Sequence, residues 1–391
     1  MAASDDRTYD VVLFGATGFT GGLTADYLAA HAPAGFRWAI AGRNADKLAA
    51  VVKRLGVEVL TLVVDSSDAA GLAEVVAQTK VVATTIGPYL QHGGPLVAAC
   101  AEAGTDYCDL TGEPEFVDRT YLEHNAAAER SGARLVHACG FDSIPHDLGA
   151  YFTVHQLAEK LGGAITGPVT MRGVVRSNAT FSGGTFHSAM GAFSRAKQMR
   201  DAMVARRKAE PKPQGRRSRA VSGKPTRDGS LGYWLLPMPT IDPFIVARSG
   251  AALPAYGPDF SYSHFAGTKT LRYAVGGTVG IGAVALAAQV PPLREQLKKR
   301  VPQGSGPSEQ RREKSWFTVD FLAESGGTTV RTRVSGGDPG YTETAKMLAE
   351  SAMCLALDDN PTTAGQVTTA QAMGDALLDR LQKAGMVFEV R

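Results

Sequence analysis

The sequence predicts an α/β fold, in which an N-terminal, doubly wound parallel sheet is joined to an inserted α+β second domain. Short apolar runs alternate with helical patterns over residues 9–138, and this alternation stops after about Leu161. The length of 391 residues suits two domains, and 44% hydrophobic with 20% charged residues is a globular composition. We expect residues 1–150 to form the first domain, 151–340 the second, and 341–391 to be helices that pack back on the first.

The first domain is predicted from its β-α alternation. Short loops between strands and helices are typical of parallel strands with right-handed crossovers, which place helices on both faces of the sheet. The expected strands are Tyr9–Phe14, Trp38–Ala41, Val57–Val64, Val81–Ile86, Asp106–Leu110 and Leu135–Ala138. The expected helices are Thr20–His31, Ala45–Leu55, Asp68–Gln78, Leu96–Ala103 and Phe116–Ser131.

The second domain has a different pattern, with longer strands and two polar segments. Residues 210–228 and 303–314 are rich in Pro, Gly, Ser and basic residues, which predicts exposed loops. The expected strands are Val169–Arg176, Phe260–His264, Trp316–Ala323 and Thr328–Val334. The expected helices are Phe186–Lys208, Tyr341–Leu357 and Thr369–Ala384.

One segment of the second domain, Val275–Val290, is apolar throughout and rich in glycine. It falls short of the ~18 residues expected of a membrane-spanning helix. Burial in the second domain or at a homodimer interface is the ordinary role of such a segment. The other role is contact with an anionic membrane or with the acyl chain of a lipid substrate, because basic residues flank it. These are Lys269, Arg272, Arg294, Lys298, Lys299 and Arg300.

Charge and cysteine content exclude several classes of protein. The formal net charge of +3 gives no reason to expect nucleic acid as a partner. The four cysteines form no C-x-x-C pair, which favours a reducing compartment. The first ten residues lack the pattern of a signal peptide, so the cytoplasm is the expected location. If residues 275–290 touch lipid, the protein would be peripheral on the inner face of the plasma membrane.

The strongest motif is GATGFTG at residues 15–21, which lies between the first strand and the first helix. Only glycine allows so tight a turn and so close an approach of the backbone to a pyrophosphate, and the helix N-terminus attracts the anion. This context indicates a Rossmann dinucleotide-binding domain rather than a packing turn without a ligand. The residues expected to contact the cofactor here are Gly15, Thr17, Gly18, Phe19, Thr20 and Gly21.

The ends of the next strands indicate which dinucleotide is bound. Arg43 stands where NAD-binding domains carry an acid, and its guanidinium can pair with a 2′-phosphate, so we expect NADP(H). The alternative is that Arg43 is a solvated residue at a helix start. Asp65 ends the third strand, where it touches the adenine edge or caps the next helix. Gly87 and Pro88 follow the fourth strand and are expected along the nicotinamide half.

Three further segments carry side chains suited to chemistry. We expect Tyr107–Glu113, Cys139–His146 and Ser182–Thr185 to line a cleft together with Gly87–Tyr89. Each segment also has a purely structural alternative. Asp142 can hydrogen-bond within its own loop, Glu113 can interact favourably with the dipole of the helix that follows it, and residues 180–185 can cap a helix. No metal site is expected, because H-x-x-x-H and C-x-x-C spacings are missing. The Tyr-x-x-x-Lys pair of short-chain dehydrogenases is also missing, and so is the G-x-S-x-G motif of serine hydrolases.

Five sequence blocks carry a resemblance to a known family: VVLFGATGFTG, AGR, TTIGPYLQHG, YCDLTGE and CGFDSIPHDLG. With SGGT at 182–185 and GDPGYTETAKM at 337–347, the chain resembles the saccharopine dehydrogenase-like oxidoreductases. Within them it is most similar to the actinobacterial trans-acting enoyl reductases. The resemblance implies NADP(H) and reduction of a C=C bond in a polyketide or fatty-acyl lipid intermediate, which a synthase presents in trans. The candidate proton donors are Tyr89 and His146, with Asp142 as a further catalytic candidate.

The sequence is also compatible with two other functions. One is a dehydrogenase of a small amino or hydroxy acid, whose carboxylates would need basic anchors in the second domain. Arg172, Arg176 and Arg195 are present but form no anchor motif. The other is a non-catalytic, cofactor-binding protein at a membrane or lipid surface. The apolar segment at 275–290 favours a lipid-related role over a small acid.

Overall fold

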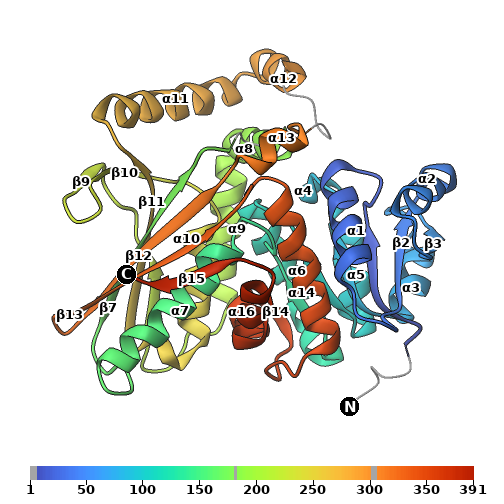
Figure 1. Cartoon of the computed structure of the whole chain (residues 1–391), viewed down its shortest axis with the longest axis horizontal. Coiled ribbons are helices and arrows are strands. Elements are labelled where there is room, and N and C mark those ends of the chain that lie inside the picture. Colours follow the sequence, from blue (N-terminus) through green and yellow to red (C-terminus); the bar gives the residue numbers. More distant parts are fainter. Residues whose placement is uncertain (1–6, 180–182, 301–305) are drawn as a thin grey trace.

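The chain folds around two β-sheets, which lie side by side in Figure 1. The computed structural model describes residues 7–179, 183–300 and 306–391. Within these residues the first sheet has seven parallel strands in the order β14-β6-β5-β4-β1-β2-β3. Its strands are β1 (Tyr9–Phe14), β2 (Trp38–Gly42), β3 (Leu60–Val63), β4 (Thr79–Thr84), β5 (Asp106–Asp109), β6 (Arg134–Val136) and β14 (Gly365–Val367).

Helices cover both faces of this sheet, as expected for a doubly wound fold. The run Val11–Phe14 in β1 is 0% exposed, because a parallel strand is buried on both sides. One face packs on α1, α2 and α14, and the other on α3, α5 and α6. The helices are α1 (Phe19–His31), α2 (Ala45–Leu55), α3 (Ala69–Ala77), α4 (Tyr89–His92), α5 (Gly94–Ala103), α6 (Pro114–Ser131), α14 (Thr342–Leu357), α15 (Thr369–Ala372) and α16 (Gly374–Lys383).

The second sheet is mixed and takes its strands from the later part of the chain. The order is β15-β13-β12-β7-β11-β10-β9, and β8 also pairs with β11. Its strands are β7 (Val169–Ser177), β8 (Arg217–Ala220), β9 (Thr226–Asp228), β10 (Tyr233–Pro237), β11 (Asp259–Thr268), β12 (Phe317–Ser325), β13 (Thr328–Gly336) and β15 (Val387–Val390). Its helices are α7 (Ile144–Lys160), α8 (Gly183–Ser194), α9 (Ala196–Ala209), α10 (Asp242–Ala252), η1 (Pro254–Tyr256), α11 (Leu271–Gln289), α12 (Pro291–Arg300) and α13 (Glu309–Glu313).

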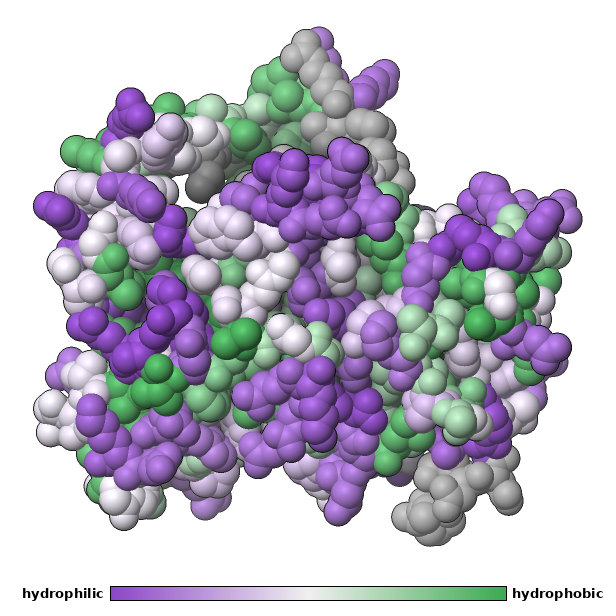
Figure 2. Space-filling view, in the orientation of Figure 1, coloured by the Kyte–Doolittle hydropathy of each residue, from purple (hydrophilic) through white to green (hydrophobic). Residues whose placement is uncertain are grey.

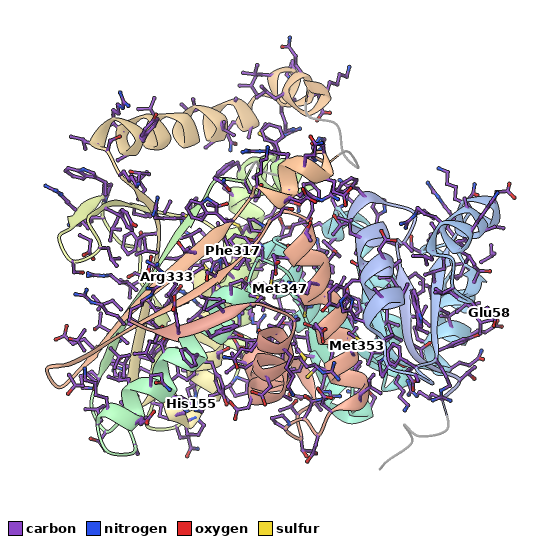
Figure 3. All side chains as sticks on the ribbon, in the orientation of Figure 1. Glu58, His155, Phe317, Arg333, Met347 and Met353 are labelled. Carbon is purple, nitrogen blue, oxygen red and sulfur yellow. The ribbon has the colours of Figure 1, made fainter. Side chains whose placement is uncertain are left out.

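The two sheets share a continuous core. Figure 3 places Phe317 and Arg333 in the second sheet, and Met347 and Met353 on α14, between this sheet and the first. Helix α7 starts at the loop after β6 and packs on β12 and β13, where Gly149 lies against the ring of Phe321. The C-terminal segment serves both sheets, because β14 extends the first and β15 pairs with β13. The loop after β6 therefore leads directly into a helix that packs on the second sheet.

The structure corrects several expectations about the second domain. Residues 210–228 are not only a loop, because β8 and β9 join the second sheet there. The single helix expected at Phe186–Lys208 is two helices, α8 and α9. They part at Arg195, which leaves the helical conformation (φ −119°, ψ 25°) while its guanidinium binds Glu115. The last helix is likewise split into α15 and α16 at Met373.

The apolar segment at 275–290 also differs from its ordinary expectation. It belongs to α11, which has 19 residues and is therefore not too short to cross a bilayer. Only 12% of its most apolar stretch is buried, so burial in the second domain is wrong. Figure 1 shows α11 and α12 along the top of the molecule, apart from the two sheets. Among the described residues, α11 is the one helix long and apolar enough to span a membrane by length and composition.

Candidate active site

The glycine-rich turn after β1 is built for close backbone contact. Gly15 has φ +91°, which side-chain-bearing residues rarely adopt, and its carbonyl accepts the N–H of Gly18 at 2.9 Å. A Cβ on Gly21 would lie 2.1 Å from the Gly15 oxygen. Helix α1 starts at Phe19 without a side-chain cap, and Thr17 and Gly18 are exposed. The first N–H groups of α1 are thus open to an anion, which fits a dinucleotide pyrophosphate.

Two of the predicted cofactor residues in this turn also have structural contacts. The ring of Phe19 packs edge-on against Tyr341, with ring centroids 4.9 Å apart, and Arg312 lies over it at 5.5 Å. The Thr20 carbonyl accepts the hydroxyl of Thr24 at 3.0 Å. The ring of Phe19 is thus held by packing, and the backbone N–H groups of both residues are placed for a phosphate at the helix start.

Arg43 and Asp65 lie near each other at the ends of β2 and β3. The Arg43 side chain is exposed just beyond Gly42. Asp65 accepts the N–H and the hydroxyl of Ser67 at 2.9 and 2.7 Å. These hydrogen bonds, with a smaller contribution from the Arg43 charge, lower the pKa of Asp65. The cap of α3 is Asp68, which accepts the N–H of Gly71, so the capping role considered for Asp65 is wrong.

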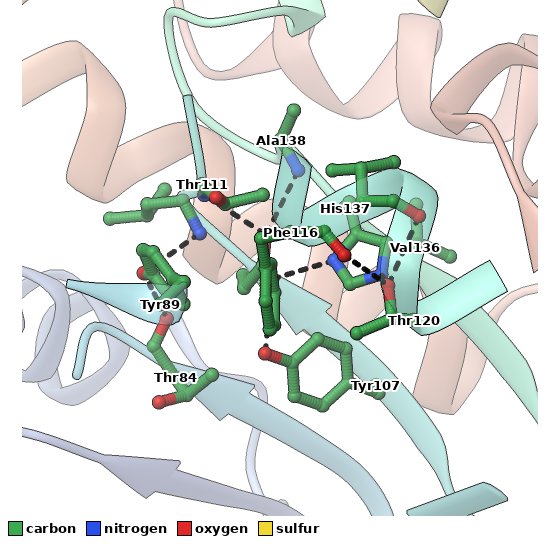
Figure 4. A network of polar contacts seen from close by, with 12 residues as sticks. Thr84, Tyr89, Tyr107, Thr111, Phe116, Thr120, Val136, His137 and Ala138 are labelled. Carbon is green, nitrogen blue, oxygen red and sulfur yellow. Dashed lines mark hydrogen bonds and ion pairs between the residues drawn. The ribbon is translucent and has the colours of Figure 1, made fainter. Parts of the chain in front are cut away.

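A buried network fixes the ends of β5 and β6 (Figure 4). The Asp109 carboxylate is 0% exposed and accepts hydrogen bonds from the Tyr107 hydroxyl and from the N–H groups of Thr111 and Ala138, each at 3.0 Å. It also lies 2.7 Å from Nδ1 of His137. With every oxygen engaged, Asp109 acts as a structural anchor that aligns the two loops beyond the strands.

Tyr89 is part of the same layer. Its hydroxyl donates to the Thr84 carbonyl and accepts the N–H of Leu110, both at 3.1 Å (Figure 4). Burial raises the pKa of Tyr89 well above its usual value. This hydroxyl points into the protein and holds two loops together, so it is poorly placed to give a proton to a substrate.

Glu113 joins two of the predicted segments, 87–89 and 107–113, to helix α8. Its carboxylate accepts the N–H groups of Tyr89 and Leu90 and the hydroxyl of Ser188 on α8, each at 3.1 Å. Burial raises the pKa of Glu113. A pocket of about 240 Å³ opens beside it, between α4, α6 and α8. Of the expected lining at 182–185, Ser182 lies outside the described residues, and the backbone of the rest begins α8.

The loop between β6 and α7 carries Asp142 to the same edge of the sheet. Asp142 is half-buried, and a Cβ on Gly112 would lie 3.1 Å from its Oδ2. Burial and the nearby charge of Asp242 raise the pKa of Asp142 to about 7. Among the three predicted catalytic side chains, Asp142 is the one that combines partial exposure with a pKa near neutrality.

Behind Asp142 lies a buried cluster made by both domains. His146 Nε2 lies 3.4 Å from Asp242 Oδ1, and His264 Nε2 lies 3.6 Å from Asp242 Oδ2. All three side chains are 1% exposed, and burial lowers the pKa of each histidine to about 3. Their ligand atoms lie within 4.8 Å of one another, a grouping that could hold a metal ion and that no sequence spacing indicated.

Known proteins match this chain over its whole length. The family model of the saccharopine dehydrogenase NADP binding domain matches residues 11–136. A trans-acting enoyl reductase of Mycobacterium bovis is 36% identical over 98% of this chain and 98% of its own. A Mycobacterium tuberculosis relative is 40% identical over 98% of this chain and 97% of its own. The chain belongs to the trans-acting enoyl reductase family.

This membership confirms the predicted fold class and the resemblance. Saccharopine dehydrogenase (L-Glu forming) of Saccharomyces cerevisiae has the same fold, with a TM-score of 0.55 over 97% of this chain and 99% of its own. At 14% identity it is evidence of the fold alone. The family member described here is an oxidoreductase that uses a nicotinamide cofactor.

The site of this family member differs from the sequence expectation in two ways. His146 stays neutral in a closed cluster, because the pKa of about 3 keeps it unprotonated at pH 7, so it has no proton to spare as an imidazolium. Asp242 and His264 were not predicted, since they lie in the second domain and meet His146 only in the folded chain. The loops at 87–89, 107–113 and 139–146 do meet at one edge, as expected.

Proposed function

We propose that this protein is an NADPH-dependent enoyl reductase that acts on a polyketide or fatty-acyl lipid intermediate presented by a synthase in trans. The main support is similarity over 98% of the chain to trans-acting enoyl reductases. Arg43 supports NADP(H) rather than NAD(H), because its exposed guanidinium lies at the end of β2, where a 2′-phosphate is recognised. When bound, the cofactor supplies a hydride to the β-carbon of the double bond.

The residue proposed to complete the reaction is Asp142. Reduction of the double bond needs one proton at the α-carbon, and a group with a pKa near the working pH is the best donor. Asp142 meets this condition, because its pKa is about 7. The neutral His146 and the closed Tyr89 hydroxyl do not meet it. Burial and, after it, the Asp242 charge raise the pKa of Asp142 to about 7, so roughly half of the carboxyl groups carry a proton at neutral pH.

The arginines of the second domain argue against a small dicarboxylate or amino-acid substrate. Arg172 is paired with Asp228, and Arg195 makes two hydrogen bonds to Glu115 at 2.8 and 2.6 Å. Arg176 donates to the Tyr233 hydroxyl at 2.7 Å and stacks on that ring. Arg172 and Arg195 are therefore already paired with acids, and Arg176 is held by an aromatic ring, whereas binding a free carboxylate calls for an unpaired cation.

The test is steady-state oxidation of NADPH with substrates of the two classes. An α,β-unsaturated acyl thioester should support turnover, with the saturated thioester as product by mass spectrometry. A 2-oxo acid with an amine donor should not, and saccharopine supplied with NADP+ should form no NADPH. Turnover of the amino-acid substrates alone would overturn the proposal. If cofactor binds but neither class is converted, even with a carrier-bound thioester, the protein is a non-catalytic binding protein and the proposal fails.

A further inference from the structure

Helix α11 presents an apolar face to the outside of the molecule. Leu271, Val275, Val279 and Leu286 are 50, 54, 65 and 73% exposed. At 100° per residue these four positions fall within an arc of roughly 80°. Ala274 and Ala288, which are 4% and 0% exposed, lie outside this arc, about 100° and 140° from its centre. The helix is therefore amphipathic in an unusual sense, with small residues toward the protein and large aliphatic ones toward the surroundings.

The contacts beneath α11 hold it parallel to the body. Gly277 faces Leu236 of β10, and the Gln289 side chain donates to the Phe193 carbonyl of α8. Its N-terminal end follows directly from β11 of the second sheet, and its C-terminal end is held against α8 by Gln289. This tethering favours a helix that lies in the plane of an interface over one that crosses it. Figure 2 shows hydrophobic residues among the polar ones at the top of the molecule, where α11 and α12 lie.

The charge around this face indicates what covers it. Residues 269–300 contain six basic residues and one acid, Glu295, which lies 3.5 Å from Arg294. Residues 273–293 contain no charged side chain at all. Lys269, Arg272 and Lys299 are exposed at the two ends of the apolar stretch. A second copy of the chain would bring these like charges together, whereas an anionic lipid surface would neutralise them.

We propose that α11 and α12 form a docking surface for anionic lipid membranes, with the apolar face of α11 at the level of the acyl chains. This inference rests on the proposed function, because membrane docking would place the reductase next to its lipid substrates. Helix α8 connects the two sites. Its Phe193 carbonyl binds α11, and its Ser188 hydroxyl binds Glu113 beside the pocket of about 240 Å³. A lipid chain leaving the membrane would meet this pocket along α8.

The experiment is vesicle flotation of the full chain, without substrate, using phosphatidylcholine vesicles with and without 40 mol% phosphatidylglycerol (a fraction of roughly this size gives a strongly anionic surface). We expect binding to the anionic vesicles only, since each basic side chain at such a surface strengthens binding about fivefold. The variant Val275→Ser/Val279→Ser/Leu286→Ser should lose binding, and Lys269→Glu/Arg272→Glu/Lys299→Glu should weaken it at least tenfold.

Matched controls are Leu60→Ser/Val63→Ser on β3, whose side chains are 60 and 62% exposed, and Arg207→Glu/Lys208→Glu on α9. Both should bind vesicles like the wild type, and all variants should keep their NADPH affinity. Equal binding to neutral vesicles, or none to either, overturns the proposal. The proposal is also overturned if the wild type binds no vesicles and sediments as a dimer, and if the serine variant dissociates that dimer. Because no turnover is measured, these outcomes are independent of whether the enoyl reductase activity is found.

Discussion

At the scale of single residues, a substitution of Asp142 is the most direct test of the proposed chemistry. Asp142→Asn keeps the shape of the side chain but removes the acidic proton. We expect kcat to fall about 10²–10⁴-fold, which is the usual contribution of a general acid, with little change in cofactor affinity. Single-turnover NADPH oxidation and calorimetry measure the two quantities. A variant with wild-type kcat would show that another group, or water, supplies the proton.

The pH profile gives a second readout of the same residue. A donor must be protonated, so kcat/KM should be flat below the Asp142 pKa of about 7 and fall as the pH rises above it. The nearby Asp242 charge raises this pKa, so Asp242→Asn should move the falling limb to lower pH. Thermal unfolding checks that this variant is folded. A limb that stays in place in Asp242→Asn contradicts the assignment.

Arg43 is the residue that decides between the two nicotinamide cofactors. A charge-assisted pair with phosphate contributes about 1.5–3 kcal/mol, which corresponds to a roughly tenfold to hundredfold preference. Arg43→Ala should therefore lose that factor in NADPH affinity and leave NADH affinity unchanged. Lys47→Ala, at another exposed position on α2, is the control. Equal loss for both cofactors would mean that Arg43 does not contact the 2′-phosphate.

At the scale of elements, the turn from β1 to α1 depends on the contact between Gly21 and Gly15. A Cβ at position 21 would lie 2.1 Å from the Gly15 oxygen, and the atom it meets is backbone, which cannot move aside. Gly21→Ala should therefore displace the start of α1 and abolish cofactor binding. Gly22→Ala, whose Cβ would meet nothing closer than 3.5 Å, should bind nearly as the wild type does. Cofactor affinity measured by fluorescence distinguishes the two.

Elements with a strong local pattern could be predicted from the sequence, and elements that depend on distant partners could not. Strands β1, β2 and β4 are largely apolar, so the expected strand at Val81–Ile86 overlaps β4, whereas the short strand β14 was missed. Strands β8 and β9 are short and polar, and only pairing with β11 and β10 makes them strands. The cluster of His146, Asp242 and His264 could not be predicted for the same reason, since its members are far apart in sequence.

At the scale of the whole molecule, Asp147 joins segments that lie far apart in the sequence. Its buried carboxylate accepts hydrogen bonds from Ser249 of α10 at 2.5 Å and from Thr369 and the Ala370 N–H of α15 at 2.7 and 2.9 Å. Asp147→Ala leaves these donors unsatisfied, so we expect the free energy of unfolding to fall by about 2–4 kcal/mol. Urea denaturation measures it, and Glu159→Ala, near the end of α7, is the matched control. A loss below 0.5 kcal/mol, about the effect of an ordinary surface change, would contradict this role.

The insertion of the second domain has a consequence for how the protein is made. Strand β14, at Gly365–Val367, completes the first sheet beside β6, whose residues 134–136 were synthesised far earlier. Until the ribosome has released β14, the outer edge of β6 has no strand partner, and an open edge invites pairing with other chains. Helix α14, which covers one face of that sheet, also arrives late. The nascent chain therefore carries an incomplete nucleotide-binding domain through most of translation, with the edge of β6 open to pairing with other chains.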